Sequence, residues 1–126
     1  MPSIAVIGAS SDRRKFGNKC VRAYQSRGYQ VYPVNPNEST IEGLPAYKSI
    51  LDVPADKIDR VSVYLPPAVG ARVMDDVARK KVGEVWLNPG ADGPHVVARS
   101  RELGLNVIAG CSIVDIGISP SELSEH

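Results

Sequence analysis

The chain has 126 residues, and its 15 lysines and arginines nearly balance 14 aspartates and glutamates, for a formal net charge of +1. This balance excludes a general affinity for nucleic acid or anionic membranes, so any preference for anions must be local. No apolar run approaches the roughly 20 residues of a membrane-spanning helix. Cys20 and Cys111 lack the spacing of a metal site or a redox pair, so we expect reduced thiols in a cytoplasmic protein.

The first predicted elements are a buried strand and a helix joined by a long turn. Residues 4–7 form a continuous apolar run that stops at Gly8, which is typical of a strand covered on both faces in a parallel sheet. An amphipathic helical pattern starts near Gly17, and Gly28 stands where a glycine cap ends a helix.

Further strands and helices alternate along the rest of the chain. Strands are predicted at residues 31–34, 60–65, 84–87 and 106–108, and helices from Pro66-Pro67 to before Gly83 and over 94–103. Residues 38–59 are irregular, with a short helix near residues 49–51. Repeated strand–helix units predict a parallel sheet with helices on both faces.

The resulting fold class is a Rossmann-like, doubly wound α/β domain with five parallel strands, in one domain over residues 1–126. Counting strands along the chain, we expect the spatial order 3-2-1-4-5, with the flavodoxin-like order 2-1-3-4-5 as the alternative. Residues 112–126 extend beyond this unit. Within them, Ser119-Pro120-Ser121-Glu122 has the pattern of a capping box with proline at the first helical position, which predicts a short terminal helix.

Four turns are expected to meet at one edge of the sheet. In open α/β sheets, ligands bind beyond the carboxyl ends of the strands, and this rule selects residues 8–15, 35–37, 65–67 and 88–90. In the first turn, Gly8 gives the backbone room to approach a ligand. The start of the following helix offers free N–H groups and a positive dipole end, which suit a phosphate.

The pattern disfavours NAD as the ligand. No glycine lies between Gly8 and Gly17, so the GxGxxG turn is missing. The residues 35–37 stand where an acidic side chain holds the ribose of NAD. The basic triplet at residues 13–15 instead suits a nucleotide with a phosphate on its ribose, although an isolated triplet is equally consistent with a solvated loop.

These motifs together resemble the stand-alone CoA-binding domain proteins, relatives of the CoA-binding domain of succinyl-CoA synthetase alpha subunits and of NDP-forming acyl-CoA synthetases. The resemblance is carried by "IAVIGASSDRRKFGNKCVRAYQSRGYQVYPVNPN", "GLPAYKSILDVP", "DRVSVYLPP", "EVWLNPGA" and "GLNVIAGC". It implies a Rossmann-like fold that binds coenzyme A. The ligases rely on a phosphorylated histidine that these motifs do not supply, so acyl-CoA synthesis is not implied, and "SIVDIGISPSELSEH" departs from the family ending.

The resemblance also implies a set of binding residues, taken over by position. They are Gly8, Ala9 and Ser10 at the diphosphate; Arg13, Arg14 or Lys15 at phosphate charges, with Asn18 nearby; Val34, Asn35 and Pro36 beside the adenosine; and Leu65, Pro66, Pro67, Asn88, Pro89, Gly90 and Cys111 along the crevice.

We therefore expect a module that binds CoA or acyl-CoA and acts as a sensor or carrier, as a monomer or homodimer, through a protein partner that the sequence does not name. The alternative is a thiol-dependent enzyme or redox protein in which Cys111 reacts with CoA or its thioesters. A NAD-binding regulatory domain ranks third. No histidine has the neighbours of a catalytic triad or a metal site, so the sequence favours a protein without catalysis but leaves that question open.

Overall fold

A computed structural model describes all residues from 1 to 126. Its main sheet contains five strands, all paired in parallel, in the spatial order β2-β1-β5-β6-β7. In chain order they are β1 (Ser3–Ile7), β2 (Gln30–Val34), β5 (Lys57–Val63), β6 (Lys81–Leu87) and β7 (Val107–Ala109). The predicted Rossmann-like α/β fold is confirmed.

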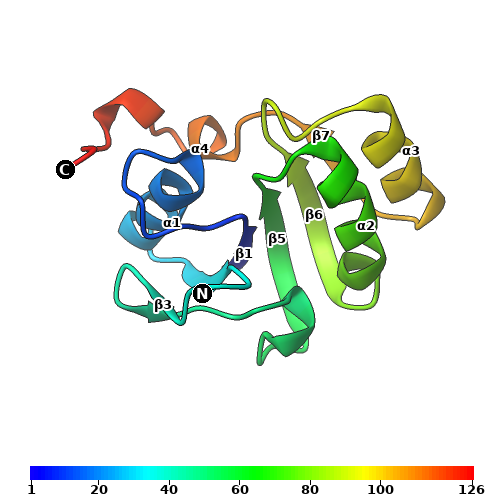
Figure 1. The fold of residues 1–126 in the computed structure, drawn as a ribbon, viewed down its shortest axis with the longest axis horizontal. Coiled ribbons are helices and arrows are strands. Elements are labelled where there is room, and N and C mark those ends of the chain that lie inside the picture. The colour runs from blue at the N-terminus through cyan, green and yellow to red at the C-terminus, as the bar shows by residue number, and fades with distance from the viewer.

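Helices cover both faces of the sheet. Figure 1 shows α1 (Phe16–Ser26) and α4 (Ser112–Asp115) on one side, and α2 (Pro67–Ala78) and α3 (Pro94–Glu102) on the other. Short 3-10 turns form η1 (Ile50–Asp52) and η2 (Pro120–Glu122). None of these helices has the length and apolar character needed to cross a membrane.

Two apolar cores lie on the two faces, because successive side chains of a strand point in opposite directions. Every residue of β1 is buried. Its Ile4 and Val6 pack with α1 and Ile113 of α4, whereas Ala5 and Ile7 pack with residues of α2, α3 and η1. Burial on both faces explains why β1 is apolar throughout, as the sequence predicted.

The favoured strand order, 3-2-1-4-5, is wrong, and the alternative order is confirmed. The strand at residues 57–63 pairs with β1 and not with the outer edge of β2. That outer edge is occupied by Tyr47, whose N–H donates to Pro33 O and whose carbonyl accepts from Asn35 N, both at 2.9 Å. Pro33 lies within β2, and proline is confined mostly to edge strands because it cannot donate to a neighbour.

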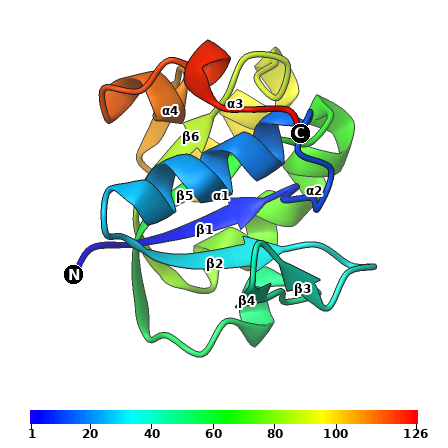
Figure 2. The same ribbon diagram turned by 90° about the vertical axis from the view of Figure 1, so that its left-hand side faces the viewer.

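The irregular stretch between β2 and β5 contains a small hairpin that the sequence analysis did not predict. Its strands are β3 (Thr40–Ile41) and β4 (Leu44–Pro45), and it lies beside the outer edge of β2 (Figure 2). Helix α4 was also not predicted. Strand β6 starts at Lys81, three residues before the predicted start, so Gly83 belongs to the strand and does not end the preceding helix.

Several predicted helix ends are confirmed. Gly28 and Gly104 have φ angles of +80° and +75° just after α1 and α3, as glycine caps require. The capping box at residues 119–122 forms, with both the Ser119 and Glu122 side chains engaged, and η2 begins directly after its N-cap residue Ser119.

Candidate functional site

A cleft of about 790 Å³ opens at the carboxyl ends of β1, β2, β5 and β6. The structure brings to this one cleft residues of all four turns that the sequence selected. The lining residues are Gly8, Ala9, Ser10, Lys15, Phe16, Gly17, Asn35, Pro36, Asn37, Glu38, Tyr64, Leu65, Pro66, Pro67, Pro89, Gly90 and Ala91.

Two glycines allow close backbone contacts at the first turn, one with the residue after β5 and one with α1. Gly8 has a φ of +91°, and a Cβ there would lie 2.4 Å from the carbonyl oxygen of Tyr64. A Cβ on Gly17 would lie only 2.1 Å from the carbonyl oxygen of Gly8. Only glycine fits at either position, so the start of α1 is pressed against the end of β1.

This close approach collects backbone donors at the cleft. The N–H groups of Ala9, Ser10, Phe16 and Gly17 have no hydrogen-bond partner within the chain. No side chain caps α1, and its first turn holds no acidic residue. Unpaired N–H groups at the positive end of a helix dipole form a binding site for an anion such as phosphate.

Two asparagines hold the first turn from opposite sides. The Asn35 side-chain amide donates to Ala9 O at 2.8 Å, and the Asn18 amide donates to Ser10 O at 2.9 Å. The carbonyl groups of Ala9 and Ser10 are thus fixed by the asparagine amides, while the N–H groups of Ala9 and Ser10 stay unpaired. Asn18 is buried and lies outside the lining, so the structure gives it a positioning role.

Only two charged side chains, Lys15 and Glu38, line the cleft. Lys15 is the N-cap residue of α1, is exposed, and forms no ion pair. Glu38 is half-buried, and its Oε2 accepts from the N–H of Ser11 at 3.0 Å and from the Asn35 amide at 3.3 Å. The lining therefore carries no net charge.

The two arginines of the basic triplet lie outside the lining. Both the guanidinium and the backbone N–H of Arg14 donate to Asp12 at 2.9 to 3.0 Å, and these hydrogen bonds lower the pKa of Asp12 to about 2. Arg13 pairs with Glu42 at 3.7 Å. Of the three cations, the structure brings only Lys15 to the cleft.

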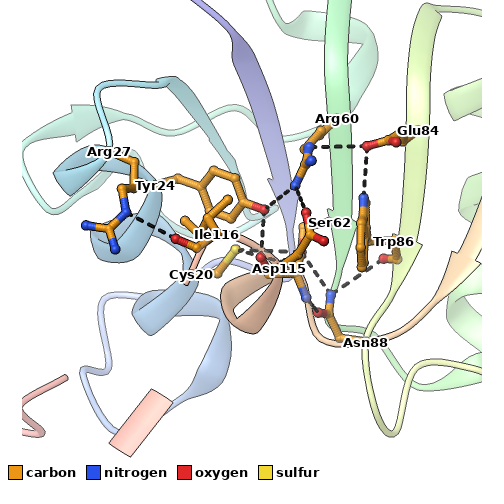
Figure 3. Close-up of polar contacts among 11 residues, drawn as sticks. Cys20, Tyr24, Arg27, Arg60, Ser62, Glu84, Trp86, Asn88, Asp115 and Ile116 are labelled. Atoms are coloured by element: carbon orange, nitrogen blue, oxygen red, sulfur yellow. Dashed lines mark hydrogen bonds and ion pairs between the residues drawn. The ribbon is translucent and has the colours of Figure 1, made fainter. Parts of the chain in front are cut away.

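Two further predicted binding residues, Val34 and Asn88, are buried and lie outside the lining, where they hold the turns that form the cleft. Val34 is buried, and its carbonyl accepts from Gly8 N at 3.2 Å. Asn88 is 1% exposed; its amide donates to Ser62 Oγ at 2.8 Å, and its Oδ1 accepts from Ser112 N at 2.9 Å (Figure 3). This network fixes the turn that presents Pro89 and Gly90 to the cleft.

Neither cysteine lines the cleft. Cys111 is half-buried at the start of α4 and packs against the core beneath α1. Cys20 is buried within the polar network of Figure 3, and burial raises the pKa of its thiol. Both are free thiols.

Six lining residues were not among the predicted binding residues: Phe16, Gly17, Asn37, Glu38, Tyr64 and Ala91. Phe16 is 53% exposed, with Lys19 Nζ 5.4 Å from its ring centroid. In the sequence, Phe16 could have been recognised as a lining residue because it directly follows the basic triplet at the start of a helix. Glu38 could not be found by position, since it follows β2 by four residues.

The chain was compared with protein families, with curated proteins and with solved structures. The model of the family described as "CoA binding domain" matches residues 2–117. The ADP-forming acetate–CoA ligase of Methanocaldococcus jannaschii is 35% identical over 89 residues, which are 70% of this chain and 12% of the ligase. The chain thus spans only a small part of this curated relative.

Two solved structures of similar size share the fold. A Thermus thermophilus protein, cell-free ID.343, is 30% identical with a TM-score of 0.84, covering 91% of this chain and 87% of that one. A hypothetical protein from Pyrococcus horikoshii is 27% identical with a TM-score of 0.82, covering 89% of this chain and 78% of that one. Because the family model matches residues 2–117, nearly the whole of this chain, the chain belongs to the CoA binding domain family.

Proposed function

We propose that this protein binds coenzyme A or an acyl-CoA in the cleft at the carboxyl ends of β1, β2, β5 and β6, as a module without a catalytic step of its own. The observation that carries the proposal is the set of four unpaired N–H groups at the cleft, on Ala9, Ser10, Phe16 and Gly17. They occur in a chain of the CoA binding domain family.

The diphosphate of CoA fits this set of donors. A diphosphate carries negative charge on several oxygens, and backbone donors at a helix start bind such groups without a dedicated basic cluster. Lys15, the one unpaired cation of the lining, adds a charge-assisted contact. This arrangement accounts for diphosphate binding by a lining whose side chains carry no net charge.

The two remaining parts of CoA are assigned to opposite ends of the cleft. With the diphosphate at the first turn, the adenosine lies toward the carboxyl end of β2 at residues 35–38, as in other Rossmann-like folds. The pantetheine arm then runs toward residues 64–67 and 89–91, where prolines and apolar side chains predominate. A cleft of about 790 Å³ is within the range of ligand sites.

A sensor or carrier role agrees better with this lining than thiol chemistry does. The lining has no cysteine or histidine, and Cys111 packs against the core beneath α1. The relative from Methanocaldococcus jannaschii is named as a ligase, but the matched region is 12% of its length. We therefore assign this chain the recognition of CoA and place any acyl transfer with a partner protein.

The test is a calorimetric titration with CoA, and with NAD as the control ligand. We expect one CoA bound per chain and much weaker binding of NAD. Amide resonances of Ala9, Ser10, Phe16 and Gly17 should shift on addition of CoA in a two-dimensional NMR spectrum, whereas those of Lys57 and Lys81, at the opposite end of the sheet, should not. Absence of CoA binding, or shifts confined to other residues, would refute the proposal.

A further inference from the structure

We propose that Lys19 is a second cation for the diphosphate of bound CoA, and that Glu125 holds its ammonium group beside the cleft until the ligand takes it over. This inference rests on the proposed function, because it takes the diphosphate to lie at the start of α1. Glu125 lies outside residues 2–117, which the family model matches, so the family match assigns it no role.

The Lys19 ammonium group lies next to the cleft without lining it. Lys19 follows Lys15 by four residues in α1, so the two side chains share one face of the helix, and Lys15 lines the cleft. Long side chains of a helix point back toward its N-terminus. Lys19 Nζ accordingly lies 5.4 Å from the ring centroid of Phe16, another lining residue.

Glu125 is the partner of this ammonium group. Its Oε2 accepts from Lys19 Nζ at 2.9 Å, which is the only ion pair of Lys19. The Lys19 side chain is only 8% exposed, and an ammonium group removed from water needs an anionic partner. In the structure without ligand, Glu125 is that partner.

The segment at residues 118–126 brings Glu125 to the start of α1. Ile118 and Leu123 pack against the core beneath α1, and the chain after η2 runs back to the start of this helix (Figure 2). The hydrogen bond from Lys19 lowers the pKa of Glu125, and the charge of Arg14 lowers it further. A carboxylate of the chain thus lies among the cations beside the proposed diphosphate site.

A bound diphosphate competes well for Lys19. The Glu125 side chain is 55% exposed, and ion pairs with such a water-exposed partner contribute little. A diphosphate offers several charged oxygens at the positive end of α1, where charge-assisted hydrogen bonds are stronger. Because coupling between two contacts is reciprocal, binding of the ligand weakens the contact of Glu125, and loss of that contact strengthens binding of the ligand.

The experiment is a calorimetric titration with CoA, at low salt, of the wild type and of Glu125→Gln. E125Q should raise CoA affinity by about three- to fivefold, because it frees the charge of Lys19 for the ligand. Glu122→Gln is the matched control from the same segment. Glu122 is exposed and its Oε1 accepts from Ser119 N at 3.2 Å, a contact that glutamine keeps, so E122Q should change the affinity less than about twofold.

Lys19→Met separates a direct role of Lys19 from the long-range effect of removing a negative charge. Methionine keeps the apolar part of the side chain and lacks the ammonium group. K19M should weaken CoA binding by about threefold, and adding E125Q to K19M should raise the affinity by less than about twofold. An equal gain from E125Q in both backgrounds would overturn the role of Lys19.

Two further measurements do not depend on the stability of K19M. Dephospho-CoA lacks only the ribose phosphate, so E125Q should raise its affinity by the same factor as that of CoA; a gain confined to CoA would overturn the assignment to the diphosphate. In the wild type, CoA should shift the amide resonances of residues 123–126. Unchanged resonances there would overturn the release of Glu125.

The outcomes separate the two proposals. If CoA binds and E125Q changes its affinity no more than E122Q does, the role of Lys19 and Glu125 is refuted and CoA binding stands. If the wild type does not bind CoA, both proposals are overturned.

Discussion

Replacing Gly17 by alanine tests whether contact between α1 and the first turn forms the anion site. The new Cβ would lie 2.1 Å from Gly8 O, 3.0 Å from Gly8 C and 3.2 Å from Ala9 Cα. All three atoms belong to the backbone, so no side-chain rotation relieves the clash. The first turn and the start of α1 must move apart.

The size of the movement follows from the distance. The contact with Gly8 O must open from 2.1 Å to at least 3.0 Å, a displacement of roughly 0.9 Å. A displacement of this size breaks hydrogen bonds from Phe16 or Gly17 to a bound phosphate. A hydrogen bond to a charged group is worth about 1.5–3 kcal/mol, so losing one lowers CoA affinity by about 10- to 150-fold.

The same clash lowers stability. Overpacking costs about 1–3 kcal/mol, which in a chain of this length lowers the melting temperature by about 4–12 °C. Calorimetric titration with CoA and thermal unfolding monitored by circular dichroism measure the two effects separately, provided that the titration is done well below the melting temperature.

Gly70→Ala is the control. Gly70 is a buried glycine within α2, and a Cβ there would meet Val96 Cγ2 at an ordinary 3.6 Å. Because alanine favours helix over glycine, G70A should leave CoA affinity unchanged and raise stability by up to about 1 kcal/mol. If G17A binds CoA like G70A does, the close contact at Gly17 does not form the site.

Two further predictions concern charge and pH. Lys15→Ala should weaken the binding of CoA and of dephospho-CoA alike, by about tenfold in calorimetric titrations at low salt. Arg14→Ala should change either affinity less than twofold, because Arg14 is paired with Asp12. A larger loss of affinity in R14A would contradict the proposed site. Burial raises the pKa of Tyr24 to about 12, so the free energy of unfolding should fall as pH rises from about 10 to 12. In urea denaturation, Tyr24→Phe should make this fall smaller; an unchanged fall would exclude Tyr24 as a titrating group. It should also lower stability at pH 8 by about 1–2 kcal/mol, since its hydroxyl donates to Ser112 O at 2.8 Å (Figure 3).

Local patterns in the sequence determined the five strands of the main sheet, the helices α1, α2 and α3, and the turns that line the cleft. The apolar run before Gly8 predicts a strand buried on both faces, and β1 is buried at every residue. Gly28 and Gly104 predict helix ends that the φ angles confirm. These features depend on neighbouring residues along the chain, through side-chain periodicity and backbone conformation, so the sequence alone carries them.

The strand order and the charges of the cleft depended on contacts between distant residues. Tyr47 covers the outer edge of β2 and leaves the edge of β1 for β5, and only Pro33 signalled this in the sequence. The cations at residues 13 and 14 are adjacent to Lys15 in sequence, but they pair with Glu42 and Asp12. Glu38 reaches the cleft through an Asx turn and a hydrogen bond from Ser11, 27 residues away. The sequence by itself gives residue types and periodicity. The partner of a charged side chain depends on which groups of opposite charge or which hydrogen-bond donors the tertiary structure brings near it.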